Sequence, residues 1–182
     1  MLDWRYEDAV SKIERLGVEG FNREVAAYWL SLWRGGTPPL LASFDPLKLA
    51  PHLASIAMVE VRLRESEHCR AAGSNIRAAV GFDLTGKDMV TLTPAHQRRE
   101  RMHLIEDVVL GSIALCHRPF LRADGSTDSV QEIALPFADM TEDGSLRYIA
   151  HTNWRPTEAE RASDQVRSDV HLARRIRTES LA

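Results

Sequence analysis

Two Asp-Gly pairs, Asp124-Gly125 and Asp143-Gly144, constrain the fold of this chain more than any other local feature of its sequence. Each pair separates two stretches of strand-like sequence, and its glycine supplies the backbone conformation that tight hairpin turns favour. The strands are expected at about 112–121, 129–137 and 146–154. Three consecutive strands joined by two hairpins form an antiparallel meander.

A second pair of strands is predicted upstream of the meander. Apolar and polar residues alternate with period two from Ile56 to Leu63, which is the pattern of a half-buried strand. A polar connector follows, and residues 68–72 are expected to form the partner strand of a hairpin. Four carboxylates of this connector and of the later turn are expected to face water without a chemical role: Glu65, Glu67, Glu142 and Asp143.

Helices are predicted on both sides of the first hairpin. Aromatic and aliphatic residues recur at three- and four-residue steps from Phe21 to Trp33, so a helix with one wide apolar stripe is expected there. Asp45-Pro46 is typical of the N-terminus of a helix, which is expected to end near Pro51. Irregular chain with short helical turns is expected between Ser74 and Leu92. Thr93-Pro94 predicts the start of a longer helix that extends to Leu110.

Composition narrows the class of protein. The chain has 182 residues, 44% of them hydrophobic, and a formal net charge of -3, which together favour one domain with its own core. This balance supplies no basic field for polyanions, so we expect no nucleic-acid partner. No apolar run reaches the roughly 20 residues of a membrane span. The N-terminus lacks a secretory pattern, so we expect a cytoplasmic protein, with Cys69 and Cys116 as reduced thiols.

The segment after residue 155 is expected to be a helix or a tail. Pro156 and the Thr157-x-x-Glu160 pattern predict a capped helix, and its apolar seam is narrow, consisting of Val166, Val170 and Ala173. We therefore divide the chain into an N-terminal helical segment with a linker (1–40), a central domain (41–155) and a C-terminal helix or tail (156–182).

The order of the predicted elements is that of a PAS domain, with two strands, a run of short helices, a longer helix and three antiparallel strands. Several motifs also resemble a family of short, mostly stand-alone bacterial PAS proteins. These motifs are Arg70-Ala71-Ala72-Gly73-Ser74-Asn75-Ile76, Gly81-Phe82-Asp83-Leu84-Thr85-Gly86, Tyr28-Trp29-x-x-Leu32-Trp33 with the later Asp45-Pro46, and Glu132-x-x-Leu135-Pro136-Phe137 before Asp143-Gly144. Together they extend over most of the chain.

The resemblance implies an α+β fold with a five-stranded antiparallel sheet in the spatial order 2-1-5-4-3. Helices would enclose a small cavity against one sheet face, and further helices would flank the domain at both ends. PAS modules hold a ligand in that cavity or leave it packed, and they use their flanking helices for dimerisation and signalling. In this arrangement the two cysteines would lie on opposite edges of the sheet, beyond the reach of a disulfide.

The function that this resemblance implies is that of a non-enzymatic sensory module. Such a module would bind a small ligand or a protein partner and signal through partners in trans, and the sequence requires no cofactor. Two alternatives remain open. One is a structural adaptor or dimerisation protein with a filled core, and the other is a small α+β enzyme that uses the cavity.

Candidate cavity residues follow from the expected inner face and from the polar positions of the family motifs. They are Ile76, Phe82, Met89, Ile105, Val109, Ile133, Leu135, Arg70 and Glu132. For each apolar member, packed core is favoured over a ligand-lining role. Arg70 and Glu132 are equally consistent with cross-strand ion pairs.

Cofactor ligands are weakly indicated. His96 and His103 lie on the predicted long helix, where some haem-binding PAS proteins place an axial histidine, and His103 is the better candidate. Both belong to a polar stripe that predicts a solvated face. No metal site is expected, and neither cysteine is placed for flavin adduct chemistry, because both fall on predicted strands.

The N-terminal aromatic stripe has two possible uses. It can cover the outer face of the sheet, or it can meet a second subunit, because a patch of this size seldom stays exposed on a monomer. We therefore expect a homodimer. The candidate interface residues are Phe21, Val25, Trp29, Leu32 and Trp33.

Overall fold

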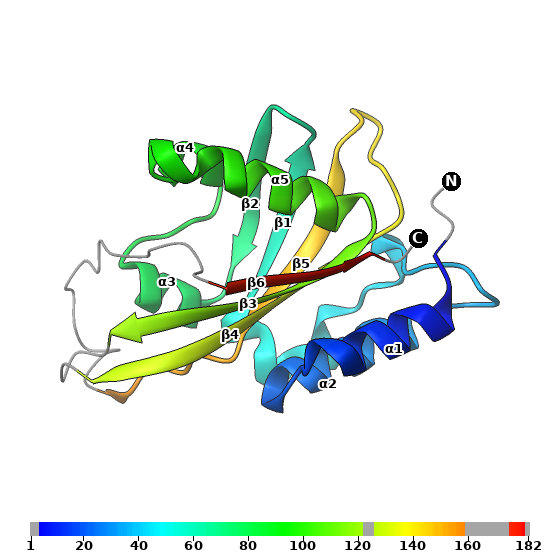
Figure 1. Cartoon of the computed structure of the whole chain (residues 1–182), viewed down its shortest axis with the longest axis horizontal. Coiled ribbons are helices and arrows are strands. Elements are labelled where there is room, and N and C mark those ends of the chain that lie inside the picture. The colour runs from blue at the N-terminus through cyan, green and yellow to red at the C-terminus, as the bar shows by residue number, and fades with distance from the viewer. Residues whose placement is uncertain (1–3, 122–125, 159–174, 181–182) are drawn as a thin grey trace.

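The computed structural model describes residues 4–121, 126–158 and 175–180. Its centre is a single antiparallel sheet whose strands lie in the order β2-β1-β5-β4-β3-β6. The strands are β1 (Ile56–Arg62), β2 (Ser66–Ala72), β3 (Ser112–Leu121), β4 (Thr127–Pro136), β5 (Leu146–Thr152) and β6 (Arg175–Ser180). The first five have the predicted order 2-1-5-4-3, and the sixth extends the sheet beyond β3 (Figure 1).

Both predicted hairpins of the meander are present. Strands β3 and β4 pair up to Leu121 opposite Thr127, while the Asp124-Gly125 pair itself lies outside the described residues. Strands β4 and β5 are joined by a longer connection that ends in a tight turn, where the Gly144 N–H donates to the Thr141 carbonyl at 3.0 Å. Gly144 has φ of +80°, the left-handed conformation for which an Asp-Gly pair is suited.

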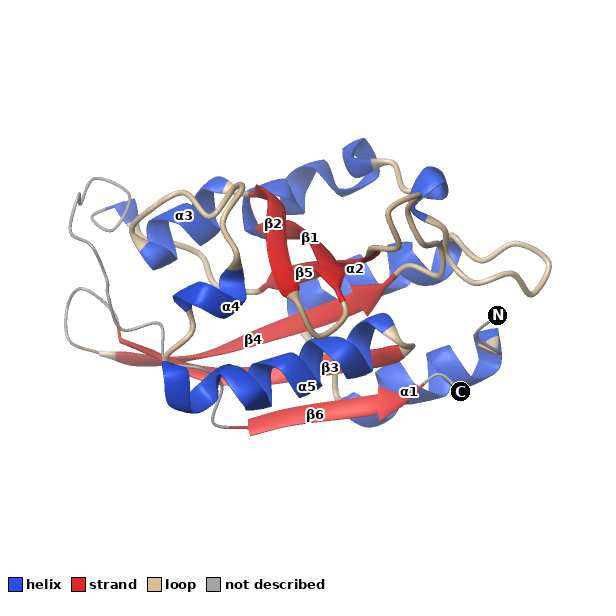
Figure 2. Cartoon of the chain, turned by 90° about the horizontal axis from the view of Figure 1, so that it is seen from above, coloured by secondary structure: helices blue, strands red, loops and turns tan. Residues whose placement is uncertain are grey.

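Helices cover both faces of the sheet. On one face lie α1 (Tyr6–Leu16) and α2 (Gly20–Ser31), and on the other lie α3 (Ser74–Val80), α4 (Met89–Leu92) and α5 (Arg98–Val109) (Figures 1 and 2). Three 3-10 helices complete the chain, namely Leu41–Ser43, Pro46–Ser55 and Ala95–Gln97. Helix α1 was not among the predicted elements. None of the helices in the described ranges is long and apolar enough to cross a membrane.

Two boundaries differ from the prediction for local reasons. The long helix was expected to begin at Thr93-Pro94, but Pro94 has an extended ψ of 138° and α5 begins only at Arg98, after a 3-10 turn. The helix at Asp45 has its predicted cap, because the Asp45 carboxylate accepts from the Leu47 N–H at 3.0 Å. This helix continues past Pro51 to Ser55, with a kink at Leu49.

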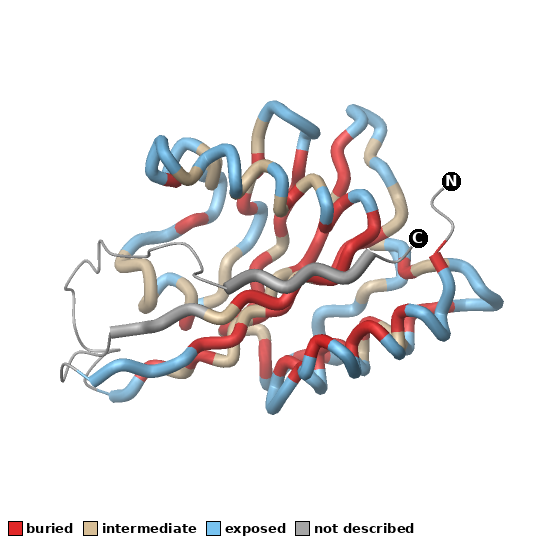
Figure 3. The backbone as a smooth tube through the Cα atoms, viewed as in Figure 1, coloured by how far each residue is buried: buried red, intermediate tan, exposed pale blue. Residues whose placement is uncertain are grey.

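Two apolar layers pack against the sheet, one on each face. Buried residues lie along the strands and along α1 and α2 (Figure 3). Because side chains alternate along a strand, β4 contributes Ile133 and Leu135 to the layer under α1 and α2, and Ala134 to the layer under α5. Trp29 from α2 is completely buried in the first layer, and its indole N–H donates to the carbonyl of Pro136 at 2.8 Å. The N-terminal helices therefore form part of the core of this domain.

The C-terminal prediction is wrong at its end. The narrow seam of Val166, Val170 and Ala173 lies outside the described residues. Residues 175–180, which were expected in a helix or tail, instead form β6, which pairs with β3 from Ser112 opposite Ser180 to His117 opposite Arg175. The free edge of β3 supplies the backbone donors and acceptors with which residues 175–180 pair.

Candidate functional site

A cavity of about 150 Å³ lies between the sheet and the helices α3, α4 and α5. Strands β1, β2, β4 and β5 form its floor, and its apolar walls include Val59, Ile76, Val80, Leu84 and Met89. The cavity exists because small side chains occupy the floor where larger ones would fill it: Ala57 and Ala150. This is the face on which the sequence resemblance places a PAS cavity.

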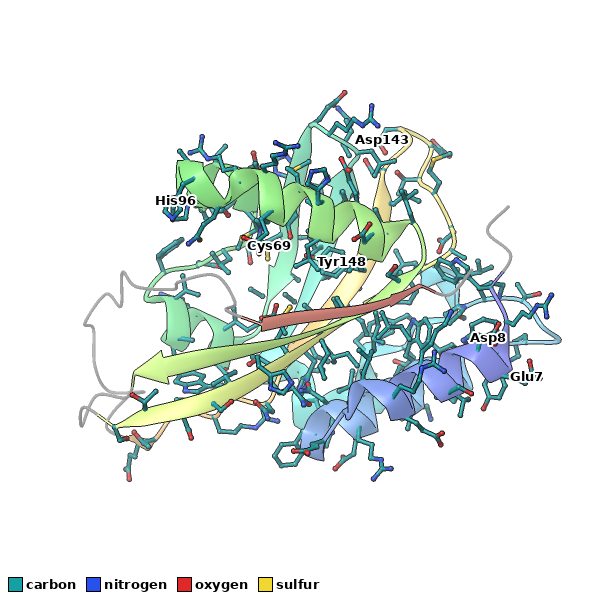
Figure 4. All side chains as sticks on the ribbon, viewed as in Figure 1. Glu7, Asp8, Cys69, His96, Asp143 and Tyr148 are labelled. Carbon is teal, nitrogen blue, oxygen red and sulfur yellow. The ribbon has the colours of Figure 1, made fainter. Side chains whose placement is uncertain are left out.

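A buried polar cluster closes part of the cavity wall. Glu67 on β2 is completely buried, and the Arg101 guanidinium on α5 donates to both of its oxygens, at 2.8 Å for Oε1. The Tyr148 hydroxyl on β5 donates to the same Oε1. Figure 4 shows Tyr148 and Cys69 in the space between α5 and the sheet. Three separate elements thus meet at one carboxylate.

The charge states of this cluster follow from its burial. Burial raises the pKa of Tyr148 well above its usual value near 10, and the negative charge of Glu67 raises it further, so the phenol stays neutral. Burial alone would lower the pKa of Arg101, but the charge and hydrogen bonds of Glu67 reverse this and raise it. The cluster is therefore a charged pair with a neutral hydroxyl, and the bonds among its members occupy both carboxylate oxygens.

The thiol of Cys69 forms part of the cavity wall. Its side chain is buried, and burial raises its pKa to about 11, so it remains a thiol near neutral pH. The Sγ hydrogen donates to the carbonyl of Ala71 at 3.4 Å. Cys69 lies on β2 and Cys116 on β3, and neither forms a disulfide bond within the described residues.

Three of the nine predicted cavity residues line the cavity. They are Ile76 on α3, Met89 on α4 and Glu132 on β4. Ile105 and Val109 are packed in the apolar layer beside it, and Phe82 is 38% exposed on a loop. The prediction therefore found the helical wall in part.

Ile133 and Leu135 were assigned to the wrong face of the sheet. Both are fully buried, but they pack under α1 and α2 on the side opposite the cavity. The error has a simple cause, because the sheet is covered on both faces and an apolar residue on β4 is buried whichever way it points. Gln131 shares their face and bonds to α2, whereas Val130 and Glu132 point to the cavity.

Arg70 also lies away from the cavity. It forms an ion pair with Glu60 on the opposite sheet face, where Arg147 on β5 reaches the same carboxylate at 2.7 Å. The hydrogen bond from Arg70 is the largest cause that lowers the pKa of Glu60. The cross-strand ion pair, one of the two predicted roles of Arg70, is therefore the one that the structure shows.

His103 does not reach the cavity. Its side chain is 65% exposed on the solvent side of α5, and its ring lies 4.0 Å from Glu106. His96 is exposed in the 3-10 helix Ala95–Gln97, which precedes α5 (Figure 4). Within the described ranges, no three His, Cys, Asp or Glu side chains are grouped so that they could hold a metal ion.

Most of the predicted dimer-interface residues are buried within this chain. Val25, Trp29, Leu32 and Trp33 are buried in the layer between the N-terminal helices and the sheet. Phe21 is 44% exposed, and the Arg155 guanidinium lies over its ring, 4.7 Å from the ring centre. Of the two uses considered for the aromatic stripe, the structure shows that it covers the outer sheet face.

Sequence reasoning missed the polar cluster. Glu67 was expected in a solvent-facing connector, but it lies one residue inside β2 and is completely buried. A signal for Arg101 was present, because it precedes Ile105 and Val108 by four and seven residues and so shares their helix face. A charged residue on an apolar helix face implies a buried partner.

Comparison with known proteins agrees with this geometry. A family model described as PAS domain matches residues 20–145, which include α2, the 3-10 helices, the first four strands and the three helices over the cavity. PAS domains are a family of sensory and signalling modules. The chain belongs to the PAS domain family.

Solved structures of PAS domains match this chain at low identity. The PAS domain of an HTR-like protein from Haloarcula marismortui is 16% identical with a TM-score of 0.34, and the match covers 54% of this chain and 84% of that one. The PAS domain of Bordetella pertussis BvgS is 15% identical with a TM-score of 0.39, covering 59% and 81%.

A third structure, an RNA-binding Light-Oxygen-Voltage receptor, is 14% identical with a TM-score of 0.40, and the match covers 87% of this chain and 55% of that one. Among curated proteins, none matches this sequence.

Proposed function

We propose that this protein is a PAS sensory module that binds a small, mainly apolar molecule in the cavity over β1, β2, β4 and β5. The observation that carries the proposal is the cavity itself, with apolar walls and a buried polar cluster whose bonds are already made. Apolar walls with a few placed polar groups are the usual lining of a small-molecule site.

The size and polarity of the cavity limit the ligand. Its volume of about 150 Å³ equals that of an engineered apolar cavity that stays dry and binds benzene. Both Glu67 oxygens already accept hydrogen bonds, so a charged ligand that bonds to Glu67 would have to displace Arg101 or Tyr148 from a buried carboxylate. This favours an uncharged molecule about the size of a substituted benzene.

Strand β5 offers a route from the cavity to the opposite face. Tyr148 and Ala150 line the cavity, whereas Ile149 and His151 on the same strand pack under the N-terminal helices. A ligand that shifts β5 changes the docking of α2, and a signalling partner in trans can read that change as a population shift. We propose the N-terminal helices as the output surface.

Native mass spectrometry of the freshly purified protein is the first test. A mass that is lost on denaturation identifies the ligand class directly. Thermal unfolding with small aromatic compounds then tests binding, since a ligand that binds only the folded state raises Tm. A protein without bound mass and without any shift in Tm would favour the adaptor with a filled core.

A matched pair of variants on α3 localises the binding. Ala79 lines the cavity and Ala78, next to it, does not. Ala79→Leu fills cavity volume, so we expect it to abolish the ligand-induced rise in Tm. Ala78→Leu should retain that rise. Equal rises in both variants would place the ligand elsewhere.

The predicted homodimer remains a proposal. PAS domains commonly mediate protein interactions and dimerisation, but a dimer of this chain must use a surface other than the four buried stripe residues. Light scattering of the wild type and of Phe21→Ala, whose residue is the exposed member of the stripe, tests whether this end of α2 takes part.

A further inference from the structure

Two histidines lie buried at the base of α2, on the sheet face opposite the cavity. His151 on β5 is completely buried, and His52 in the 3-10 helix Pro46–Ser55 is 3% exposed. Their ring centres are 5.5 Å apart and their planes are nearly perpendicular. Neither residue takes part in the cavity, so the ligand-binding role proposed above does not explain them.

Each histidine makes one hydrogen bond to α2. His151 Nδ1 lies 2.6 Å from Asn22 Oδ1, and His52 Nε2 lies 2.9 Å from Glu24 Oε2. The carboxylate of Glu24 can only accept, so the His52 Nε2–H is the donor of that bond.

The hydrogen bonds of Asn22 decide which His151 nitrogen carries the proton. The Asn22 amide nitrogen donates to the backbone and side-chain oxygens of Gln131, at 3.0 and 3.1 Å. Its Oδ1 therefore faces His151 as an acceptor, so His151 Nδ1 carries a proton. Within the described part of the chain, His151 Nε2 and His52 Nδ1 are buried without hydrogen-bond partners.

The charges around His151 oppose a second proton. Arg155, which follows β5, and His52 both lower its pKa, in addition to the larger effect of burial. From α2 it contacts the neutral Asn22, which in turn bonds to the neutral Gln131 on β4. The carboxylate of Glu24 is bonded to His52 instead and is 63% exposed. An imidazolium at His151 would thus lie beside a guanidinium, with no carboxylate bonded to it.

We propose that protonation of His151 releases α2 from the sheet, so that the N-terminal helices form an acid-sensitive latch. When α2 is released, both nitrogens of the His151 imidazole can bond to water, whereas in the docked state only Nδ1 has a hydrogen-bond partner. This input requires no ligand in the cavity. It acts on β5 and α2, which are the same two elements through which the ligand is proposed to signal.

The expected size follows from linkage. The pKa of His151 is about 3 while α2 is docked and has its ordinary value of 6.5 when α2 is released. The contribution of His151 to the free energy of docking α2 is therefore complete above pH 6.5 and decreases as the pH falls towards 3. The equilibrium for docking should weaken about tenfold at pH 5.5 and about thirtyfold at pH 5.0.

Hydrogen exchange of the full chain tests the latch. At pH 5.5, after correction for the chemical exchange rate, we expect the open fraction of the α2 amides to be about tenfold higher than at pH 7.5. The amides of β1 and α5 should be unchanged. If these amides open together with α2, the protein unfolds globally and the proposal is wrong.

Two substitutions of the same kind complete the test. His151→Gln keeps a donor for Asn22 but cannot be protonated, so its α2 amides should lose the tenfold dependence on pH. His103→Gln, at an exposed position on α5, should keep it. An equal pH dependence in wild type and His151→Gln would overturn the proposal, as would the absence of any dependence in the wild type.

A second measurement uses the wild type alone, in case His151→Gln does not fold. Imidazole 15N chemical shifts should show His151 neutral with the proton on Nδ1 for as long as α2 is docked. A titration of His151 near pH 6.5 while the α2 amides stay protected would contradict the latch.

Discussion

The indole N–H of Trp29 on α2 donates a 2.8 Å hydrogen bond to the carbonyl oxygen of Pro136, the last residue of β4. Trp29 is completely buried, and its ring packs edge-on against Trp33 at a centroid distance of 6.1 Å. This one bond ties the N-terminal layer to the meander across 107 residues of sequence. Trp29, a candidate for a dimer interface, thus packs and bonds within its own chain.

Trp29→Phe should therefore destabilise the domain more than the same change at Trp33. The variant keeps an aromatic ring but leaves the buried Pro136 carbonyl without this donor, which costs about 1–3 kcal/mol of unfolding free energy. Trp33 is the control, because its buried indole N–H has no partner among the described residues. Urea unfolding measures both variants, and equal losses would contradict the importance of the bond.

Arg101→Met should be strongly destabilising. It leaves the Glu67 carboxylate buried without its charged partner, for which a loss of about 3–5 kcal/mol is typical. Arg99→Met, at an exposed position on the same helix, should change the unfolding free energy little. The double variant Glu67→Gln with Arg101→Met should recover part of the loss, since it removes both charges. A double variant as unstable as the sum of the two single ones would refute this coupling.

The raised pKa of Tyr148 predicts how the stability of the domain changes at alkaline pH. Its pKa is raised by burial and by Glu67, so the folded state holds its proton more tightly than the unfolded state. The corresponding stability is complete below pH 10 and is lost as the pH rises from there towards the folded-state value. The phenolate absorbance of the wild type minus that of Tyr148→Phe should show no step near pH 10 in the folded protein, and a step in urea. A step in the folded protein would show that Tyr148 is open to solvent.

Cys69 should be unreactive in the native state. The thiolate is the nucleophile in disulfide exchange, and burial raises the Cys69 pKa to about 11 and also blocks access. An aromatic disulfide reagent at about pH 8 should react with neither cysteine of the folded protein and with both in denaturant. Cys69→Ala identifies the contribution of Cys69. Rapid reaction in the native wild type would show that the cavity opens frequently.

The sequence was most informative where local geometry decides the structure. The alternation from Ile56 onward, the Asp-Gly pairs and the Asp45 cap depend on residues a few positions apart, and each predicted its element with small boundary errors. The positions of the glycines and the order of the strands in the five-stranded sheet also agree with those that the family motifs imply. Boundaries failed where a 3-10 turn replaced the first turn of α5.

The cavity was predictable in part. Ile76 and Met89 lie on short helices that lie over one face only, so their placement followed from the fold. Ile133 and Leu135 could not be assigned, because both faces of β4 are covered and hydrophobicity does not distinguish them. Glu67 and Arg101 meet across 34 residues, and only the packing of α5 on the sheet brings them together.

The sequence by itself therefore determined the type of sheet, the meander and the PAS class, because these depend on short-range patterns in a known order. Tertiary structure alone decided three things: that the aromatic stripe of α2 covers the sheet, that residues 175–180 join the edge of β3, and that His151 is buried neutral under Asn22. The physical reason is common to all three. Each depends on which surfaces and free hydrogen-bonding groups remain available after the five strands have paired, and distant parts of the chain supply them.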